Sequence, residues 1–529
     1  MLTRILVLVW AQIVLGYAIW MLMVYLTDVW KLTITHAAGI INAQRGLICA
    51  LPIVMQTIVD TLAGNYWMLT FSSFACCTGM GLLTMSTPPV LSKSTGACSA
   101  YEPDCIGDIQ QILFYIALVL LAVGIAGGAY SLACFLPEQF MDAMENISDR
   151  SMITACVGNV ITFLITAAAV LGLPYVKPWS LRFGIPTIFL LVAIVIFLSG
   201  SSTYSHIGPQ GSHLTMVLRV FVAFTSKLFC QRPADSNELY QKQLCTIPHT
   251  RNLRCLDKAA IVLPNQSLEE QQNDRWKLCS ILEVEATKLI ISLIPMSMSF
   301  LFLGLIFPLA FTFFLEQAKT MDHKVGSLTI PLAILLWFNV QAKDYFPKVY
   351  FTISSLLCGS ISRIATSGII ASMVLAVLCC VTAAKVESRR LDMVTTHGLL
   401  DKPNEKVPMS VFWLLPQFIL LGAVDGVFVQ SLASFFSLYF TPTLNSYMVN
   451  LSHVVHGLGC FGSILLAYVV NNITEKEGKP GWFQATLNRS RLDNYFWLLS
   501  VVMVINLGLF LIMRLCYRCC SKEEQIKIV

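Results

Sequence analysis

The sequence carries very little charge for its length. Only 12% of its 529 residues are Asp, Glu, Lys or Arg, against about 25% in soluble proteins, while 56% are hydrophobic. A soluble fold has no interior large enough to bury so many apolar side chains, and the mean hydropathy of +0.70 agrees with this. The net charge is only +5 and no basic tract stands out, which excludes nucleic acid as a partner. The composition therefore indicates a chain that lies largely in a lipid bilayer.

The sequence also lacks the patterns of several other classes of protein. It contains no nucleophile–base pair, phosphate-binding loop or metal-ligand spacing, so we expect no enzyme, no metal site and no cofactor. Its apolar runs are continuous rather than alternating, which excludes the strands of a membrane β-barrel. Most of the 18 Cys lie within these runs, where cysteine usually behaves as a small apolar residue rather than as part of a disulfide scaffold.

Long apolar segments are what the chain does contain. A helix needs about 20 such residues to cross the hydrocarbon core of a bilayer, and twelve segments qualify. We interpret the first as a membrane span rather than a signal peptide, because no small-x-small cleavage site follows it. The predicted spans are 5–27, 38–62, 67–86, 111–135, 152–175, 183–201, 288–315, 328–350, 361–384, 408–431, 445–470 and 495–516.

A polar, basic stretch at 202–286 separates the sixth span from the seventh. Basic loops stay on the cytoplasmic side of membranes, so we expect this linker and both termini to be cytoplasmic. Within the linker, 213–229 has apolar residues at helical spacing, which is typical either of a helix lying in the membrane interface or of an ordinary soluble helix. One group of basic residues argues against the topology, because it would lie outside: Lys385, Arg389, Arg390, Lys402 and Lys406.

The layout predicts an all-α membrane protein with twelve transmembrane helices in two six-helix bundles. The N-terminal bundle covers 1–201, the linker covers 202–286, and the C-terminal bundle with a cytoplasmic tail covers 287–529. Two such bundles around a cavity at the membrane midplane form the major facilitator fold, in which the solute binds between the halves.

Several motifs, in order along the whole chain, resemble the proton-coupled oligopeptide transporter family and in particular its plant branch, the nitrate/peptide transporters. The family pattern G-x-x-x-Y followed by P-x-G-S is matched at Gly200–Tyr204 and Pro209–Ser212, and Thr312–Asp322 is similar to T-F-F-x-x-Q-x-x-x-M-D. Further matches are Trp179–Pro186, Val284–Lys288, Lys385–Glu387, Gly398–Asp401, Pro408–Ser410, Leu487–Asp493 and a weakened copy of F-G-A-D-Q-F at Phe135–Phe140. The resemblance implies the major facilitator fold and secondary active transport of nitrate, peptides, plant hormones or metabolites, commonly driven by protons.

The family's proton-coupling motif E-x-x-E-R is absent from the first span. Leu8, Ala11 and Gln12 stand at its three positions, and Gln12 can form a hydrogen bond but cannot carry a proton at neutral pH. On the tenth span Ser434 stands where the family often has an acid. We therefore expect this to be a divergent member in which proton coupling is in doubt, with Gln12 and Ser434 retained as candidate solute contacts.

Two charges at membrane depth are further candidates for solute binding, since such charges are costly unless they have a function. Glu316, beside Gln317, matches an acid–amide pair of peptide-transporting relatives; the alternative is a carboxylate at the helix end that pairs with Lys319. Arg45 has no acid near it in its own helix, and its planar guanidinium suits carboxylates and nitrate-like oxyanions. The alternative for Arg45 is a side chain that reaches the lipid headgroups.

Other polar residues in the spans are interpreted as structural or gating groups. Asp60 and Gly64 match the Asp and Gly of the facilitator loop motif D-x-x-x-G-R, which resembles a latch between helices, while Asn65 replaces its Arg. We expect Lys343 and Asp344 to form an internal ion pair. The remaining groups, Asp425, His453 and His456, are more typical of packing than of a site.

The predicted outside loops carry candidate modification sites. Cys98 and Cys105 lie in a compartment that permits a disulfide, and family members often carry Cys there. Asn472 and Asn488 begin N-x-S/T sequons and are candidate glycosylation sites.

These features predict a secondary transporter of a small solute that works by alternating access in the plasma or vacuolar membrane. The bilayer, the solute and, if coupling survives, protons are its expected partners. The alternative is a membrane sensor or regulatory partner of the same fold that no longer transports, and the missing coupling residues are the feature that favours it.

Overall fold

The computed structural model describes residues 2–95, 98, 100–141, 149–209, 211–230, 239–240, 253–263, 270–271, 274, 276–438, 440, 442–475 and 480–526. Parts of the predicted linker 202–286 therefore lie outside the described residues. Within them the chain is mostly helical, and the only strands are short: β1 (Met321–Asp322), β2 (Lys324–Val325), β3 (Leu328–Thr329) and β4 (Val407–Ser410). β1 pairs in parallel with β4, and β2 pairs with β3.

Each of the twelve predicted spans falls on helix. The first six are α1 (Leu2–Trp20) with α2 (Leu22–Asp28), α3 (Ile34–Ala50) with α4 (Pro52–Ile58) and a π-helical turn (Val59–Ala63), α5 (Gly64–Met85), α7 (Asp108–Met141), α8 (Asp149–Gly172) and α9 (Trp179–Leu198). The last six are α12 (Ile281–Met298) with α13 (Phe300–Ile306), a 3-10 turn (Phe307–Phe311) and α14 (Phe313–Thr320), then α15 (Ala333–Cys358), α16 (Ile361–Thr396), α17 (Leu415–Phe436), α18 (Pro442–Thr474) and α19 (Leu492–Ile526).

Length and apolar composition alone identify nine spanning stretches among the described residues. One of these, Ile34–Met85, holds two predicted spans, because the chain bends at Gly64. Of the other two predicted spans, α8 contains the apolar stretch Val160–Tyr175, and α15 carries Lys343, Asp344 and Lys348. The all-helical, twelve-span prediction is confirmed.

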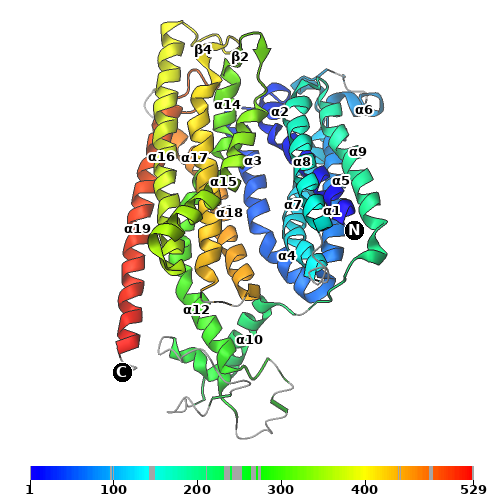
Figure 1. Ribbon diagram of the computed structural model, residues 1–529. Coiled ribbons are helices and arrows are strands. Elements are labelled where there is room, and N and C mark those ends of the chain that lie inside the picture. Colours follow the sequence, from blue (N-terminus) through cyan, green and yellow to red (C-terminus); the bar gives the residue numbers. More distant parts are fainter. Residues whose placement is uncertain are drawn as a thin grey trace.

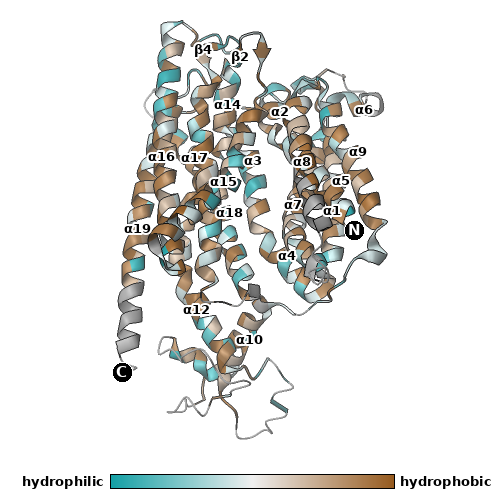
Figure 2. Ribbon diagram, in the orientation of Figure 1, coloured by the Kyte–Doolittle hydropathy of each residue, from teal (hydrophilic) through white to brown (hydrophobic). Residues whose placement is uncertain are grey.

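The helices form two bundles that stand side by side, with α10 (His213–Ser226) and the start of α12 below them (Figure 1). Hydrophobic residues cover the outward faces of the bundles (Figure 2), for example Val195 on α9 and Ile505 on α19, which are 62% and 57% exposed. A lipid environment explains this exposure, because apolar side chains on these faces would otherwise contact water. The protein is therefore an integral, multi-pass membrane protein.

Glycines allow close helix contacts inside the C-terminal bundle. A Cβ added at Gly304 on α13 would lie 2.2 Å from the carbonyl oxygen of His456 on α18, and one added at Gly426 on α17 would lie 2.0 Å from that of Lys343 on α15. No side chain fits at such distances, so these positions set the spacing of the helices, as small residues commonly do in membranes.

The connecting loops gather at two opposite ends of the bundles. At one end, β1 pairs with β4, Arg390 bonds to the loop at Leu487–Asn488, and Tyr175 bonds to Thr329. At the other end, Gln139 bonds to Ser205 and Gly211 bonds to Asp60. This separation agrees with the predicted assignment of loops to two sides of the membrane.

Two of the five basic residues that argue against this topology pair with acids. Arg390 pairs with Glu387 at 2.8 Å, and Lys402 pairs with Glu405 at 3.1 Å. The Arg389 guanidinium lies over the Trp413 ring, 4.0 Å from its centroid. Because the positive-inside rule counts Lys and Arg and gives little weight to acids, these contacts do not remove the objection.

We expect a protease-cleavable tag inserted at residue 240 to be protected in intact cells, and a tag at residue 480 to be cut from outside. The reason is that the basic linker belongs on the cytoplasmic side, while residue 480 lies in the loop at the opposite end. Permeabilised cells, in which both tags should be cut, provide the control. Equal cleavage of the two tags in sealed cells would refute the topology.

The described part of the linker packs into a small core of its own. Val220 and Ala223 of α10 are buried against Leu256 and Ala260 of the 3-10 helix Arg254–Ala260. Lys227 is 1% exposed and its Nζ donates to the carbonyl oxygens of Ala259 and Ile261 at 3.3 and 2.6 Å, while burial lowers its pKa to about 8. The opposite face of α10 exposes Leu214, Leu218, Phe221 and Val222, as expected for contact with the membrane interface.

Candidate functional site

A cavity of about 470 Å³ lies at mid-height between the two bundles. Its walls come from α1, α3, α5, α7 and α8 of the first half and from α15 of the second half. Tyr17, Trp20 and Phe311 pack ring to ring at its edge, with centroids 4.2 Å apart for Tyr17–Trp20 and 5.8 Å for Trp20–Phe311. The polar side chains in its wall are Gln12, Tyr17, Arg45, Thr162, Thr166, Gln341 and Asp344.

Arg45 lies in the wall of this cavity. Its guanidinium carbon is 3.6 Å from the centroid of the Phe311 ring, a cation–π contact that reaches from one half to the other. Within the described residues the guanidinium has no hydrogen bond and no ion pair, so its donors are available to a solute. The alternative in which Arg45 reaches the lipid headgroups does not fit this position.

Gln12 also lines the cavity, whereas the other two positions of the lost coupling motif do not. Leu8 and Ala11 are fully buried in the packing of α1. Gln12 approaches Gly128 on α7 so closely that a Cβ added there would lie 3.2 Å from its Nε2. The structure thus places two of the four candidate solute contacts, Gln12 and Arg45, in the wall of one cavity.

Asp344 is a cavity residue that the sequence analysis missed. We expected it to pair with Lys343, but Lys343 instead pairs with Asp425 on α17 at 2.7 Å, and Asp344 lines the cavity. The prediction was wrong because adjacent residues on a helix do not face each other. The cavity therefore presents one cation from the first half and one anion from the second.

Glu316 is buried near one end of the bundles and is not part of the cavity wall. Its carboxylate accepts a hydrogen bond from Thr27 Oγ1 at 3.2 Å and lies 3.4 Å from Lys319 Nζ. Lys319 in turn pairs with Asp28 on α2 at 2.5 Å. The geometry corresponds to the ion-pair alternative, and it makes Glu316 part of a polar contact between the halves.

Asp60 forms the corresponding contact at the opposite end. Tyr447 on α18 donates its hydroxyl hydrogen to Asp60 Oδ2 at 2.6 Å, and Ser212 Oγ lies 2.7 Å from the same hydroxyl. Gly64 has φ of +70° and a Cβ there would lie 3.0 Å from the carbonyl oxygen of Ile207, so both the turn and the contact require glycine. This arrangement suits the latch predicted for Asp60 and Gly64.

Ser434 is not brought together with the other candidates. Its hydroxyl donates to the carbonyl oxygen of Gln430 at 2.9 Å, within its own helix, and the residue is absent from the cavity wall. Serine hydroxyls commonly form this bond in helices, and the side chain is too short to reach further. His456 is buried against the Phe307 and Phe428 rings, in agreement with a packing role.

The predicted modification sites have different surroundings. Cys98 and Cys105 are joined in a disulfide, with Cα atoms 5.0 Å apart. Asn472 is exposed near the end of α18. Asn488 is 2% exposed, accepts from Arg390 at 2.9 Å and donates to the carbonyl oxygen of Leu399 at 3.0 Å. A glycan on that nitrogen would break this network, so the folded structure argues against glycosylation at Asn488.

Similarity to known proteins agrees with this architecture. The sequence profile described as the POT family matches residues 66–483. The chain is 40% identical to Protein NRT1/ PTR FAMILY 5.5 of Arabidopsis thaliana over 98% of this chain and 97% of that protein. It is 29% identical to Protein NRT1/ PTR FAMILY 5.6 of the same plant, over 95% and 88% of the two chains.

Solved structures show the same fold. The crystal structure of an auto-inhibited POT family peptide transporter superposes with a TM-score of 0.64, covering 98% of this chain and 96% of that one at 14% identity. A POT family transporter in complex with 5-aminolevulinic acid superposes with a TM-score of 0.56, covering 97% and 95% of the two chains at 12% identity. The chain therefore belongs to the POT family of membrane transporters, in its plant NRT1/PTR branch, and is not an enzyme.

Proposed function

We propose that this transporter moves a small solute that carries an anionic group beside an amine or another hydrogen-bond donor. The observation that carries the proposal is the cavity between the halves, in which Arg45 has no hydrogen-bond or ion-pair partner among the described residues and Asp344 supplies the opposite charge. Arg45 would bind a carboxylate or similar oxyanion in a fork, and Asp344 would accept from the donor. Nitrate, small peptides, acidic hormones and amino-acid-like metabolites all contain the anionic group.

Polar contacts between the halves at both ends of the cavity support alternating access. Thr27, Glu316 and Lys319 meet at one end, and Asp60 and Tyr447 meet at the other. Contacts of this kind would break and form in turn as the halves rock about the solute. A cavity with gates at both ends favours transport over the sensor alternative.

The 5-aminolevulinic acid complex is consistent with this solute class. That ligand of a related fold carries one carboxylate and one amine, which is the charge pattern presented here by Arg45 and Asp344. The likeness covers the fold at low identity, so the proposal depends on the two residues themselves.

Uptake of a charge-matched panel tests the proposal. The panel contains a monoanion, a zwitterion of similar size, the corresponding cation and an uncharged analogue, and uptake is measured in oocytes expressing the protein and in water-injected controls. We expect uptake of the zwitterion and of the anion, and none of the cation. Uptake of the cation alone would contradict the proposal, and no uptake of any member together with normal surface expression would favour the sensor.

Transport should depend only weakly on an imposed proton gradient. The coupling positions hold Leu8, Ala11 and Gln12, and the remaining candidate acid, Glu316, is held by Thr27 and Lys319. We therefore expect initial uptake rates to change little across external pH or with a protonophore, and any residual dependence to vanish in Glu316→Gln, which retains the shape but cannot ionise. A steep gradient dependence that survives Glu316→Gln would contradict this and would point to Asp344 or Asp425.

A further inference from the structure

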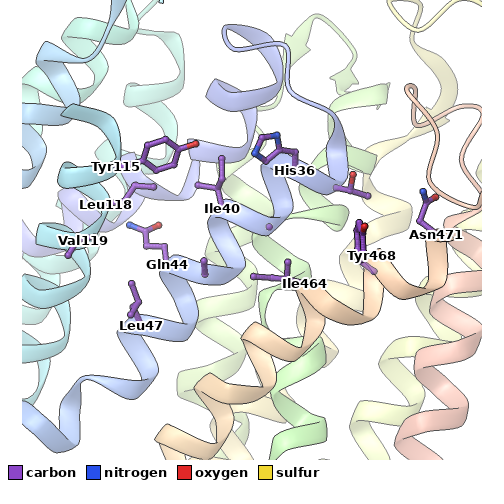
Figure 3. A pocket seen from close by; sticks show the side chains of 14 residues that line it. His36, Ile40, Gln44, Leu47, Tyr115, Leu118, Val119, Ile464, Tyr468 and Asn471 are labelled. Atoms are coloured by element: carbon purple, nitrogen blue, oxygen red, sulfur yellow. The ribbon is translucent and has the colours of Figure 1, made fainter. Parts of the chain in front are cut away.

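A second cavity, of about 640 Å³, lies away from the central one, between α3, α7 and α18 (Figure 3). We call it the lateral groove. Tyr115 on α7 and Tyr468 on α18 stand at its edges and are 44% and 66% exposed. Such exposure on spanning helices means contact with lipid, so the lateral groove is open to molecules that arrive from the bilayer.

The floor of the lateral groove is apolar and is formed in part by small residues of α3. Gly39 and Ala43 lie four residues apart on α3 and so share one face, with Ile40, Leu118 and Ile464 beside them. A Cβ at Gly39 would meet only Ile464, at 3.6 Å, which is an ordinary contact distance. Contact between the helices therefore does not require glycine at this position. A flat hydrocarbon body fits such a surface better than a branched one does.

Gln44 gives this apolar groove a specific polar contact. Its side chain is 3% exposed, its Nε2 has no hydrogen-bond partner among the described residues, and it projects from α3 towards Leu118 in the groove (Figure 3). A buried amide donor without a partner is rare in native structures and indicates a missing ligand or water. Gln44 therefore points to a ligand with an acceptor oxygen at this depth.

The outer end of the lateral groove carries a second polar group of residues. Thr35 and His36 lie in the first turn of α3. His36 and Asn471, which is near the end of α18, are both seen in Figure 3. His36 and Gln44 are separated by about 12 Å along the helix, at about 1.5 Å per residue. None of the residues lining the groove is Lys, Arg, Asp or Glu, so a phosphate headgroup would find no fixed counter-charge.

We propose that the lateral groove binds a flat, uncharged membrane lipid of the sterol type that carries a polar oxygen near each end. One oxygen lies with His36 and Asn471 at the outer end, and the other accepts from Gln44 Nε2. Because α3 and α7 belong to the first half and α18 to the second, a bound lipid touches both halves. It therefore stabilises whichever arrangement of the halves forms the groove, and it alters the transport rate by shifting that population.

Photolabelling of the full-length protein in proteoliposomes tests the site. A photoreactive sterol and a photoreactive phosphatidylcholine are compared, and the labelled peptides are mapped by mass spectrometry. We expect the sterol probe to label α3, α7 and α18 around the groove, and Ala43→Phe, which fills the floor, to remove that labelling. Leu465→Phe is the matched control, since Leu465 is 65% exposed on α18 and does not line the groove.

The role of Gln44 is tested with two competitors, cholesterol and a sterol that bears an additional hydroxyl on its side chain. We expect the hydroxylated sterol to compete about fivefold more strongly, the effect of one buried hydrogen bond, and Gln44→Leu to abolish that difference while labelling persists. Equal groove labelling by phosphatidylcholine, or sterol labelling that survives Ala43→Phe, would overturn the site. An undiminished preference in Gln44→Leu would overturn the oxygen contact and leave water as its partner.

Discussion

Replacement of Arg45 by Ala is expected to weaken transport of an anionic solute strongly while the protein still reaches the membrane. The guanidinium lines the central cavity and its donors have no protein partner among the described residues, so its removal takes charge-assisted hydrogen bonds from the solute and few from the fold. Such bonds contribute about 1.5–3 kcal/mol, which corresponds to about a 10- to 100-fold loss of apparent affinity. Uptake kinetics at matched surface expression measure this loss.

Two further substitutions sharpen the test at Arg45. Arg45→Lys retains the charge but loses the planar fork, so some transport should remain with a weaker apparent affinity. Arg389→Ala is the matched control, because Arg389 also lies over an aromatic ring, that of Trp413, but far from the cavity. Its transport should be close to that of the wild-type protein. Near-normal uptake of an anion by Arg45→Ala would refute the cavity role.

Asp344 provides the complementary measurement. If it accepts from the donor group of the solute, Asp344→Asn should weaken zwitterion uptake more than uptake of a simple monoanion. Arg45→Ala should weaken both. Equal losses for the two solutes in Asp344→Asn would mean that the carboxylate supports the cavity rather than contacting the solute.

The spans and the polar residues within them were predictable from the sequence, because each depends on local composition. Apolar length placed each of the twelve predicted spans on helix, and the absence of a nearby acid in its own helix singled out Arg45. These inferences needed no knowledge of which helices touch.

The remaining features depend on contacts between distant segments, which one sequence does not reveal. Lys343 pairs with Asp425 from another helix, and Asp344 lines the central cavity instead of pairing with Lys343. Glu316 is held by Thr27 from the other half. The Asn488 sequon is buried by Arg390 and Leu399. In each case the partner of a side chain comes from a distant segment, so it is known only once the packing of the helices is known.

The buried network around Arg390 shows how strong such a contact is. Arg390 is fully buried, and its guanidinium donates to both carboxylate oxygens of Glu387 at 2.8 Å and to Asn488 Oδ1 at 2.9 Å. Glu387 also accepts from Gln317 Nε2 at 2.6 Å. The network joins α16 to α14 and to the loop before α19, so it fixes several elements of the C-terminal bundle at once.

Arg390→Met is therefore expected to lower the free energy of unfolding by about 3–5 kcal/mol, because it leaves the Glu387 carboxylate buried without its cation. Thermal unfolding of the detergent-solubilised protein, followed by fluorescence-detected size exclusion, measures the change. Arg489→Ala is the control: Arg489 pairs with Asp401 on the surface, where both side chains are more than half exposed, and such pairs contribute about 0–1 kcal/mol.

The double variant Glu387→Gln with Arg390→Met should recover part of the stability, since the amide needs no counter-charge and can still accept from Gln317. If the double variant is no more stable than Arg390→Met, the unpaired carboxylate is not the cause of the loss, and the missing packing of the Arg390 side chain would have to account for it.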